Sequence, residues 1–150
     1  MAQTGKQFTI EGAEIAFRNF SGKEGQYNAE GQRSFLLILR DENFAQQLLA
    51  DGWNVKYLRP QEEGEAPTAC LAVAVRFDKV PPKIIAITSV ARTRLTEDMV
   101  DTLDFADISN IDLIVKASSW EVNGKTGLKA YLKSLYATIE EDELERKYEI

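Results

Sequence analysis

Two extended runs joined by a short polar turn restrict most strongly what this chain can fold into. Apolar and polar residues alternate from Ile111, and the same pattern returns between Leu128 and Lys133. Alternation with a period of two is typical of a strand with one buried face. Asn123 and Gly124, which lie between the runs, tolerate the positive φ angles of a type I′ turn. The sequence therefore predicts a β-hairpin over residues 111–139.

The second run of this hairpin has two unlike faces. One face is apolar, and the other carries an aromatic ring between two ammonium groups; the two sets are Leu128, Ala130 and Leu132 against Lys129, Tyr131 and Lys133. From Leu135 onward the apolar positions change parity. A β-bulge or sharp bend near Ser134 explains this change, and such bends let small barrels turn their corners.

Composition excludes several classes of protein. A chain of 150 residues fits one domain that needs neither disulfides nor metal. Cys70, the single cysteine, lies in an apolar run and is expected to be a buried side chain in a reducing, cytoplasmic compartment. The beginning of the sequence has no apolar signal segment, and no run approaches the roughly 20 apolar residues of a membrane span. Histidine is absent, which rules out Ser-His-Asp and Cys-His catalysis, and no cofactor is expected.

The rest of the chain indicates a mainly β domain. Strands are expected at 8–17 with a bulge near Gly12, and at 35–39, 53–57, 69–77 and 84–87, and short helices are expected at 41–52 and 96–103. The run 69–77 is the most apolar and should be the central strand. Pro81 and Pro82 favour an edge or corner position for the strand that follows, with Arg92 and Arg94 in the next connection. Six or seven strands with two short helices favour a small curled β-barrel, and the oligonucleotide/oligosaccharide-binding (OB) barrel fits best.

The negative charge of the chain is concentrated at its end. The net charge is −6, and residues 140–150 contribute −4 of it through six acids and two bases. Residues 1–139 are therefore nearly neutral and can still present a basic face. We expect an OB-like domain over 1–139, followed by an acidic C-terminal tail over 140–150.

Several motifs form an ordered set over nearly the whole chain: Arg18 to Gly25, Asn28 to Phe35, Asp51 to Val55, Pro81 to Ile84, Trp120 to Gly127, and Lys129 to Leu132. Together they resemble a family of phage and prophage proteins regarded as OB-fold single-stranded-DNA-binding proteins. The resemblance implies sequence-tolerant binding of single strands in phage replication or recombination, in the host cytoplasm, without enzymatic activity. It also implies that the acidic tail recruits replication or recombination proteins, although the Pro-Phe ending of the bacterial group is missing. The oligomeric state, including a homo-oligomer, is left open.

Binding single strands requires cations for phosphates and exposed rings on which bases can stack. Two sets of residues offer both: the hairpin, and the flanks of the glycine-rich loop 21–32. The candidate residues are Arg18, Phe20, Lys23, Tyr27, Arg33, Trp120, Lys125, Lys129, Tyr131 and Lys133. The competing interpretations are that Trp53 and Trp120 belong to the core, that the Lys-Tyr-Lys face is only solvated, and that the loop is merely mobile.

Two other function classes stay open at this point. Asp98, Asp101, Asp104, Asp107 and Asp112 could hold Mg²⁺ for a nuclease, although a solvated acidic face explains their spacing more simply. The acidic tail and low isoelectric point would also suit an interaction protein that imitates DNA, but the Lys-Tyr-Lys face opposes this hypothesis.

Overall fold

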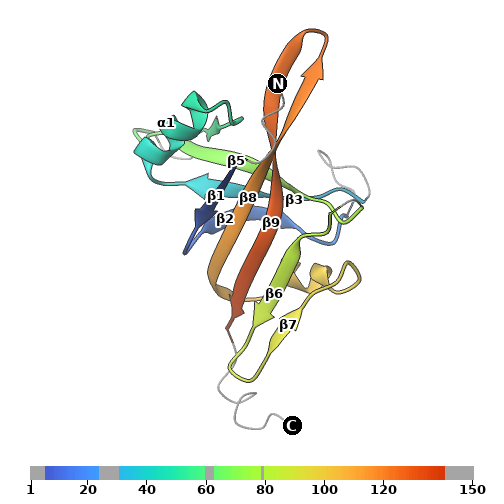
Figure 1. Cartoon of the computed structure of the whole chain (residues 1–150). Coiled ribbons are helices and arrows are strands. Elements are labelled where there is room, and N and C mark those ends of the chain that lie inside the picture. Colours follow the sequence, from blue (N-terminus) through green and yellow to red (C-terminus); the bar gives the residue numbers. More distant parts are fainter. Residues whose placement is uncertain (1–5, 24–30, 60–62, 79, 141–150) are drawn as a thin grey trace.

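The computed structural model describes residues 6–23, 31–59, 63–78 and 80–140. These residues form a single curled sheet with one α-helix and one short 3-10 helix (Figure 1). In chain order the elements are β1 (Gln7–Ile10), β2 (Glu14–Asn19), β3 (Arg33–Leu39), α1 (Glu42–Ala50), β4 (Lys56–Leu58), β5 (Thr68–Val75), β6 (Lys83–Ile87), β7 (Arg92–Arg94), η1 (Val100–Asp104), β8 (Ile108–Val122) and β9 (Lys125–Ile139).

The sheet curls, but its ladder of hydrogen bonds does not close. The strands follow the order β1-β8-β9-β5-β3-β2, with β4 added to β5, and β6 added to β9. The two end strands follow one another in the chain, and Gly12 turns between them with a φ of +64°. The Gly12 amide donates to Asp112, and the Ala13 amide donates to the carbonyl of Ile111. The expected curled barrel is thus present as an open, curled sheet, and the expected bulge near Gly12 is a break between two strands.

The hairpin is the longest element, and the prediction for it is confirmed. Strands β8 and β9 pair along their length around a turn in which Asn123 and Gly124 have φ angles of +53° and +78°. The register shifts between the pairs Ile114–Ser134 and Val115–Leu132, so the predicted bulge lies at Lys133. Beyond the body of the sheet the hairpin continues as a protruding arm (Figure 1).

Because of the bulge, β9 pairs with a different strand on each side of it. Before it, β9 runs parallel to β5, with Val73 opposite Ala130. After it, β9 runs parallel to β6, with Ile85 opposite Tyr136. The predicted inward residues on both sides of the bulge are buried: Leu128, Ala130, Leu132, Leu135 and Ala137.

The helix covers one side of the core. Asp41 caps it by accepting from the amides of Asn43 and Phe44, as its sequence predicts. The rings of Phe44, Phe8 and Trp53 meet edge to face, and Trp53 is 4% exposed. Trp53 is thus a core residue. Cys70 is buried as expected, and burial raises the pKa of its thiol.

Of the two positions expected for the strand after the prolines, an edge or a corner, β6 occupies the corner: it lies between β9 and β7 and pairs with β9 beyond the bulge, where β9 has left β5. The two prolines precede it and leave its own amides able to pair. Three other local predictions are wrong. Arg92 and Arg94 belong to strand β7 rather than to a connection. The second helix is only the five-residue 3-10 helix η1, and the strand expected at 53–57 begins at Lys56, with Trp53 making one isolated bridge to Leu128. No helix in the described residues is long and apolar enough to cross a membrane.

Candidate nucleic-acid interface

Most of the binding candidates that the sequence predicted on the hairpin lie on one of its faces. Because side chains alternate along a strand, every second residue of β8 shares a face with its partners on β9. The partners on this face are Lys116 with Tyr131, Ser118 with Lys129, Trp120 with Gly127, and Val122 with Lys125. We call this set the hairpin face.

Trp120 is exposed at the base of the arm and lies flat against the partner strand. Its side chain is 43% exposed. A methyl group built on Gly127 would come within 2.7–2.9 Å of three atoms of the indole, so the ring covers the glycine backbone. An aromatic ring over a cross-strand glycine is held in place on one side and open on the other. The interpretation of Trp120 as a core residue is therefore wrong, and the ring can act as a stacking platform.

A hollow of about 640 Å³ adjoins the hairpin face, and we call it the groove. Trp120 and Lys129 line one side of the groove, and Arg33 with Glu97 lines the opposite side. A second hollow of about 220 Å³ shares Arg76 and Asp78 with the groove and is also lined by Lys116 and Tyr131. The two hollows thus join the hairpin face to strands β3 and β5.

Small side chains form part of the groove lining. Ser34 on β3 lies opposite Ala74 on β5, and Ala74 lies beside Tyr131 on β9. Ala72, two residues earlier on β5, also lines the groove. Short side chains at these positions leave room for planar groups to approach the sheet, and Tyr131 offers a ring at the same level.

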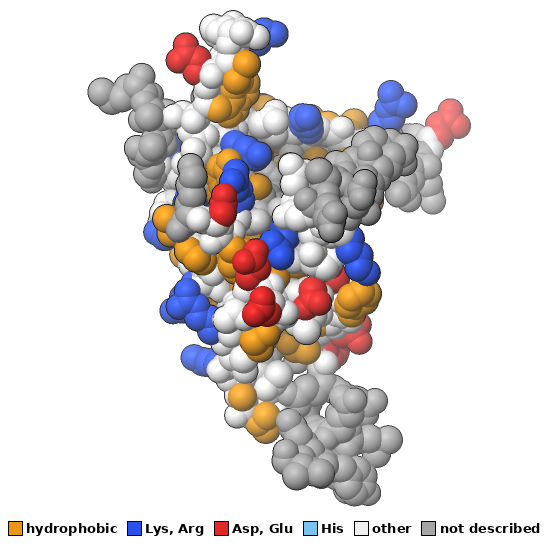
Figure 2. All heavy atoms as spheres, turned by 90° about the vertical axis from the view of Figure 1, so that its right-hand side faces the viewer, with side chains coloured by type: hydrophobic (Ala, Val, Ile, Leu, Met, Phe, Trp, Pro, Cys, Tyr) orange, Lys and Arg blue, Asp and Glu red, His pale blue; other side chains and the backbone are white. Residues whose placement is uncertain are grey.

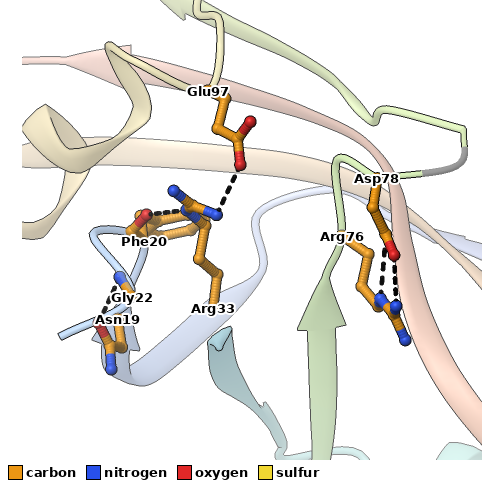
Figure 3. A network of polar contacts seen from close by, with 7 residues as sticks. All are labelled: Asn19, Phe20, Gly22, Arg33, Arg76, Asp78 and Glu97. Atoms are coloured by element: carbon orange, nitrogen blue, oxygen red, sulfur yellow. Dashed lines mark hydrogen bonds and ion pairs between the residues drawn. The ribbon is translucent and has the colours of Figure 1, made fainter. Parts of the chain in front are cut away.

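The arginines of the groove are paired with acids (Figure 3). Arg33 donates to Glu97 across 3.0 Å and to the carbonyl of Phe20 across 2.9 Å, and its guanidinium lies 5.5 Å from the centre of the Phe77 ring. Arg76 donates through Nε to Asp78 across 3.1 Å. Asp78 and, to a smaller extent, Tyr131 raise the pKa of Arg76 above its ordinary value.

The lysines of the hairpin face have no acidic partner among the residues that the structure describes. The Lys129 ammonium lies 5.6 Å from the centre of the Tyr131 ring, and Lys125 is exposed beside the turn. Lys133, at the bulge, donates to the side chain of Gln7 across 3.0 Å. Figure 2 shows Lys and Arg side chains on the protruding arm and across the middle of one face of the molecule, mixed with acidic side chains.

The binding candidates predicted around the glycine-rich loop do not lie together in the structure. Phe20 is fully buried and stacks on Phe35, so its ring is not available to a base. Arg18 donates to the carbonyls of Leu103 and Ala106 and thereby holds the end of η1. Lys23 lies 5.2 Å from the centre of the Phe105 ring, outside the groove lining. Tyr27 lies outside the described residues. Among the members of this set that the structure describes, Arg33 alone lines the groove.

Sequence reasoning missed Lys116, Arg76 and Gly127 as parts of the interface. Lys116 shares the parity of Trp120, and Arg76 shares the outward parity of Ala72 and Ala74, so alternation could have indicated both. The two-residue turn at Asn123 and Gly124 also places Gly127 opposite Trp120, so the predicted register could have indicated this contact too.

Two of the five aspartates weighed as a metal site, Asp104 and Asp112, have local structural roles. Asp104 accepts from the amides of Phe20 and Ser21 across 2.7 and 3.0 Å. Asp112 accepts from Gly12 and Asn110. Within the described ranges no group of three or more His, Cys, Asp or Glu side chains is placed to hold a metal ion.

Comparison with protein families now identifies the chain. The family described as "Putative phage ssDNA-binding domain" matches residues 2–150. The chain belongs to this family. A comparison with curated protein sequences gives no significant match.

Solved structures of a phage single-stranded DNA-binding protein have a fold similar to that of this chain. The single-stranded DNA-binding protein from bacteriophage Enc34 is similar with a TM-score of 0.57 and 10% identity, over 91% of this chain and 82% of that chain. The same protein in complex with ssDNA is similar with a TM-score of 0.58 and 10% identity, over 91% and 88% of the two chains. At this identity the likeness concerns the fold. It confirms the predicted mainly β, OB-like architecture.

The packing of Trp120 on Gly127 leads to a testable expectation. Gly127→Ala should push the indole off the strand, because the added methyl group would overlap it. We expect single-strand affinity to fall by up to the roughly 1–3 kcal/mol that one stacked base contributes. The same substitution in a Trp120→Ala background should cost almost nothing further, which a double-mutant cycle measures. Equal losses in both backgrounds would show that Gly127 does not act through Trp120.

Proposed function

We propose that the chain binds single-stranded DNA along the hairpin face and the groove. The observation that carries this proposal is the placement of two rings, the exposed Trp120 and the half-buried Tyr131, and three lysines on one face beside a hollow with small side chains. Stacking rings and a cationic track are the two components that sequence-tolerant single-strand binders combine. Family membership supports the same function.

The spacing of the rings indicates how a strand would lie. Gly127, which marks the position of Trp120, and Tyr131 are four residues apart on β9. At about 3.4 Å per residue the rings are roughly 14 Å apart, so they stack on different bases of one strand. Lys129 lies between them and can contact the intervening phosphate. A duplex hides its base faces in the helical stack and cannot use either ring.

We further propose that binding is the whole activity, without catalysis, and that it serves phage replication or recombination in the host cytoplasm. Unpaired strands arise in both processes, and a sequence-tolerant binder can cover them wherever they form. The same titrations also test whether the chain assembles with itself, because cooperative binding would make the binding isotherm steeper.

The cationic track can be tested through salt. The double variant Lys125→Gln and Lys129→Gln should reduce the slope of log affinity against log salt by about 0.7 for each phosphate that is no longer neutralised. Lys56→Gln is a matched control, because Lys56 is exposed on β4 and lines neither hollow. Titrations of an oligo(dT) at four salt concentrations provide the slopes. If the double variant and the control share the wild-type slope, these lysines do not bind phosphates.

The acidic tail gives another expectation. The tail comprises residues 140–150, of which 141–150 lie outside the described residues, and we propose that it competes with DNA for the cationic track and recruits replication or recombination proteins. Truncation after Glu140 keeps the hydrogen bond from its amide to Asp107. Single-strand binding at low salt should then tighten while the melting temperature stays constant. A large fall in melting temperature, or dissociation of an oligomer in sizing, would mean that the tail is structural.

A further inference from the structure

The groove differs from the hairpin face in how its charges are arranged. Two of its cations are arginines, and each is already paired with a carboxylate: Arg33 with Glu97, and Arg76 with Asp78. A paired cation attracts a phosphate less strongly than one without an acidic neighbour, because the field of its partner opposes it. The lysines of the hairpin face are therefore the stronger phosphate contacts. The groove is available to another part of the DNA.

An arginine beside a carboxylate presents hydrogen-bond donors next to acceptors. A carboxylate has about four lone-pair sites, so one ion pair does not exhaust it. Glu97 uses Oε2 for Arg33, its side chain is 55% exposed, and Oε1 has no hydrogen bond to any residue that the structure describes. Arg33 is held firmly, since it is 18% exposed and also donates to the Phe20 carbonyl. The groove thus offers an exposed acceptor beside a firmly held donor.

We propose that this arrangement, which rests on the single-strand binding proposed above, reads base edges. The phosphates follow the lysines of the hairpin face, and a base extends into the groove toward the Arg33–Glu97 pair; both oxygens of Asp78 already accept from Arg76. Cytosine places an amino group where thymine has the O4 carbonyl, and Asp and Glu carboxylates accept hydrogen bonds from that amino group. A carbonyl facing a carboxylate is instead repelled. The groove therefore favours cytosine over thymine, within an otherwise sequence-tolerant site.

The test compares two pyrimidines of similar size, so that stacking area stays matched. Full-length protein is titrated with oligo(dC) and oligo(dT) of equal length at one pH near 7.5 and one salt concentration. We expect oligo(dC) to bind about three- to tenfold more tightly, a modest share of what a good bidentate base contact provides. The variant Glu97→Gln should bring this ratio close to one, because a neutral amide can donate to thymine as well as accept from cytosine.

A charge-matched control separates base reading from simple repulsion. Asp98→Asn removes one acid next to Glu97 but outside the groove lining, and it should leave the ratio unchanged. An equal tightening of both oligonucleotides by Glu97→Gln, with the ratio preserved, would show that the carboxylate only repels the DNA and would overturn the inference. A wild-type ratio of one would do the same while single-strand binding stands. If neither oligonucleotide binds the wild-type protein, the proposed function itself fails.

Discussion

Replacing Trp120 and Tyr131 together with alanine is expected to weaken single-strand binding by about 2–6 kcal/mol, the largest fall in affinity that any pair of substitutions in this chain should cause. Each ring contributes one stacking surface, and the rings are far enough apart for their contributions to add. Both side chains line the hollows beside the hairpin face rather than the core. Titration with labelled oligo(dT) at low salt measures the change.

The control for this double variant is another exposed aromatic residue. Tyr57 is 41% exposed on β4 and lines neither hollow, so Tyr57→Ala should leave affinity unchanged. Thermal melting must show that the double variant is folded. If the double variant is folded and binds like the wild type, these two rings do not stack on bases.

Phe20→Ala should destabilise the domain by about 3–5 kcal/mol, the usual cost of deleting a buried phenyl ring. The ring is 0% exposed and stacks on Phe35 with centroids 5.7 Å apart. For a domain of this size the destabilisation corresponds to a melting temperature lower by roughly 6–20 °C. Calorimetry or melting followed by circular dichroism provides the value.

Phe20→Leu distinguishes a core role from the base-stacking role that the sequence suggested. Leucine refills much of the cavity but cannot stack on a base, so we expect partial recovery of stability and wild-type affinity for oligo(dT). A variant with an unchanged melting temperature and a clear fall in affinity would instead place Phe20 at the interface.

The hairpin could be predicted in detail because its determinants are local. Asn123 and Gly124 specify the turn, strict alternation specifies the buried face, and the parity change at Leu135 reveals the bulge at Lys133. The capped helix α1 and the central strand β5 depend on equally local signals. Each of these features follows from residues that are close together in the sequence.

The features that were missed depend on interactions between distant segments. Gly12 breaks the first strand because the edge of β8 at Ile111 and Asp112 receives the amides of residues 12 and 13. Strand β7 forms from a polar segment because β6 offers it an edge with which to pair. The acids of η1 look solvent-facing in the sequence, yet Asp104 binds two amides of the segment that follows β2.

The candidate site, like the fold, has parts that could be predicted from local sequence and parts that could not. The hairpin residues were placed together correctly because alternation assigns them to one face. The loop residues were grouped by sequence proximity, which does not report burial, so Phe20 and Arg18 were assigned to the interface although they hold the fold together. The groove itself required the register of β3, β5 and β9 and could not be read from one sequence.

Competition between unpaired and paired DNA tests the central claim most directly. The full-length protein is titrated with a labelled oligo(dT) and with a duplex of the same length, each at low and at moderate salt. The account predicts tight binding of the single strand, much weaker binding of the duplex because its bases cannot reach Trp120 and Tyr131, and a decrease of affinity with salt for both. Equal affinity for the two ligands, or no binding of oligo(dT) at low salt, would contradict it.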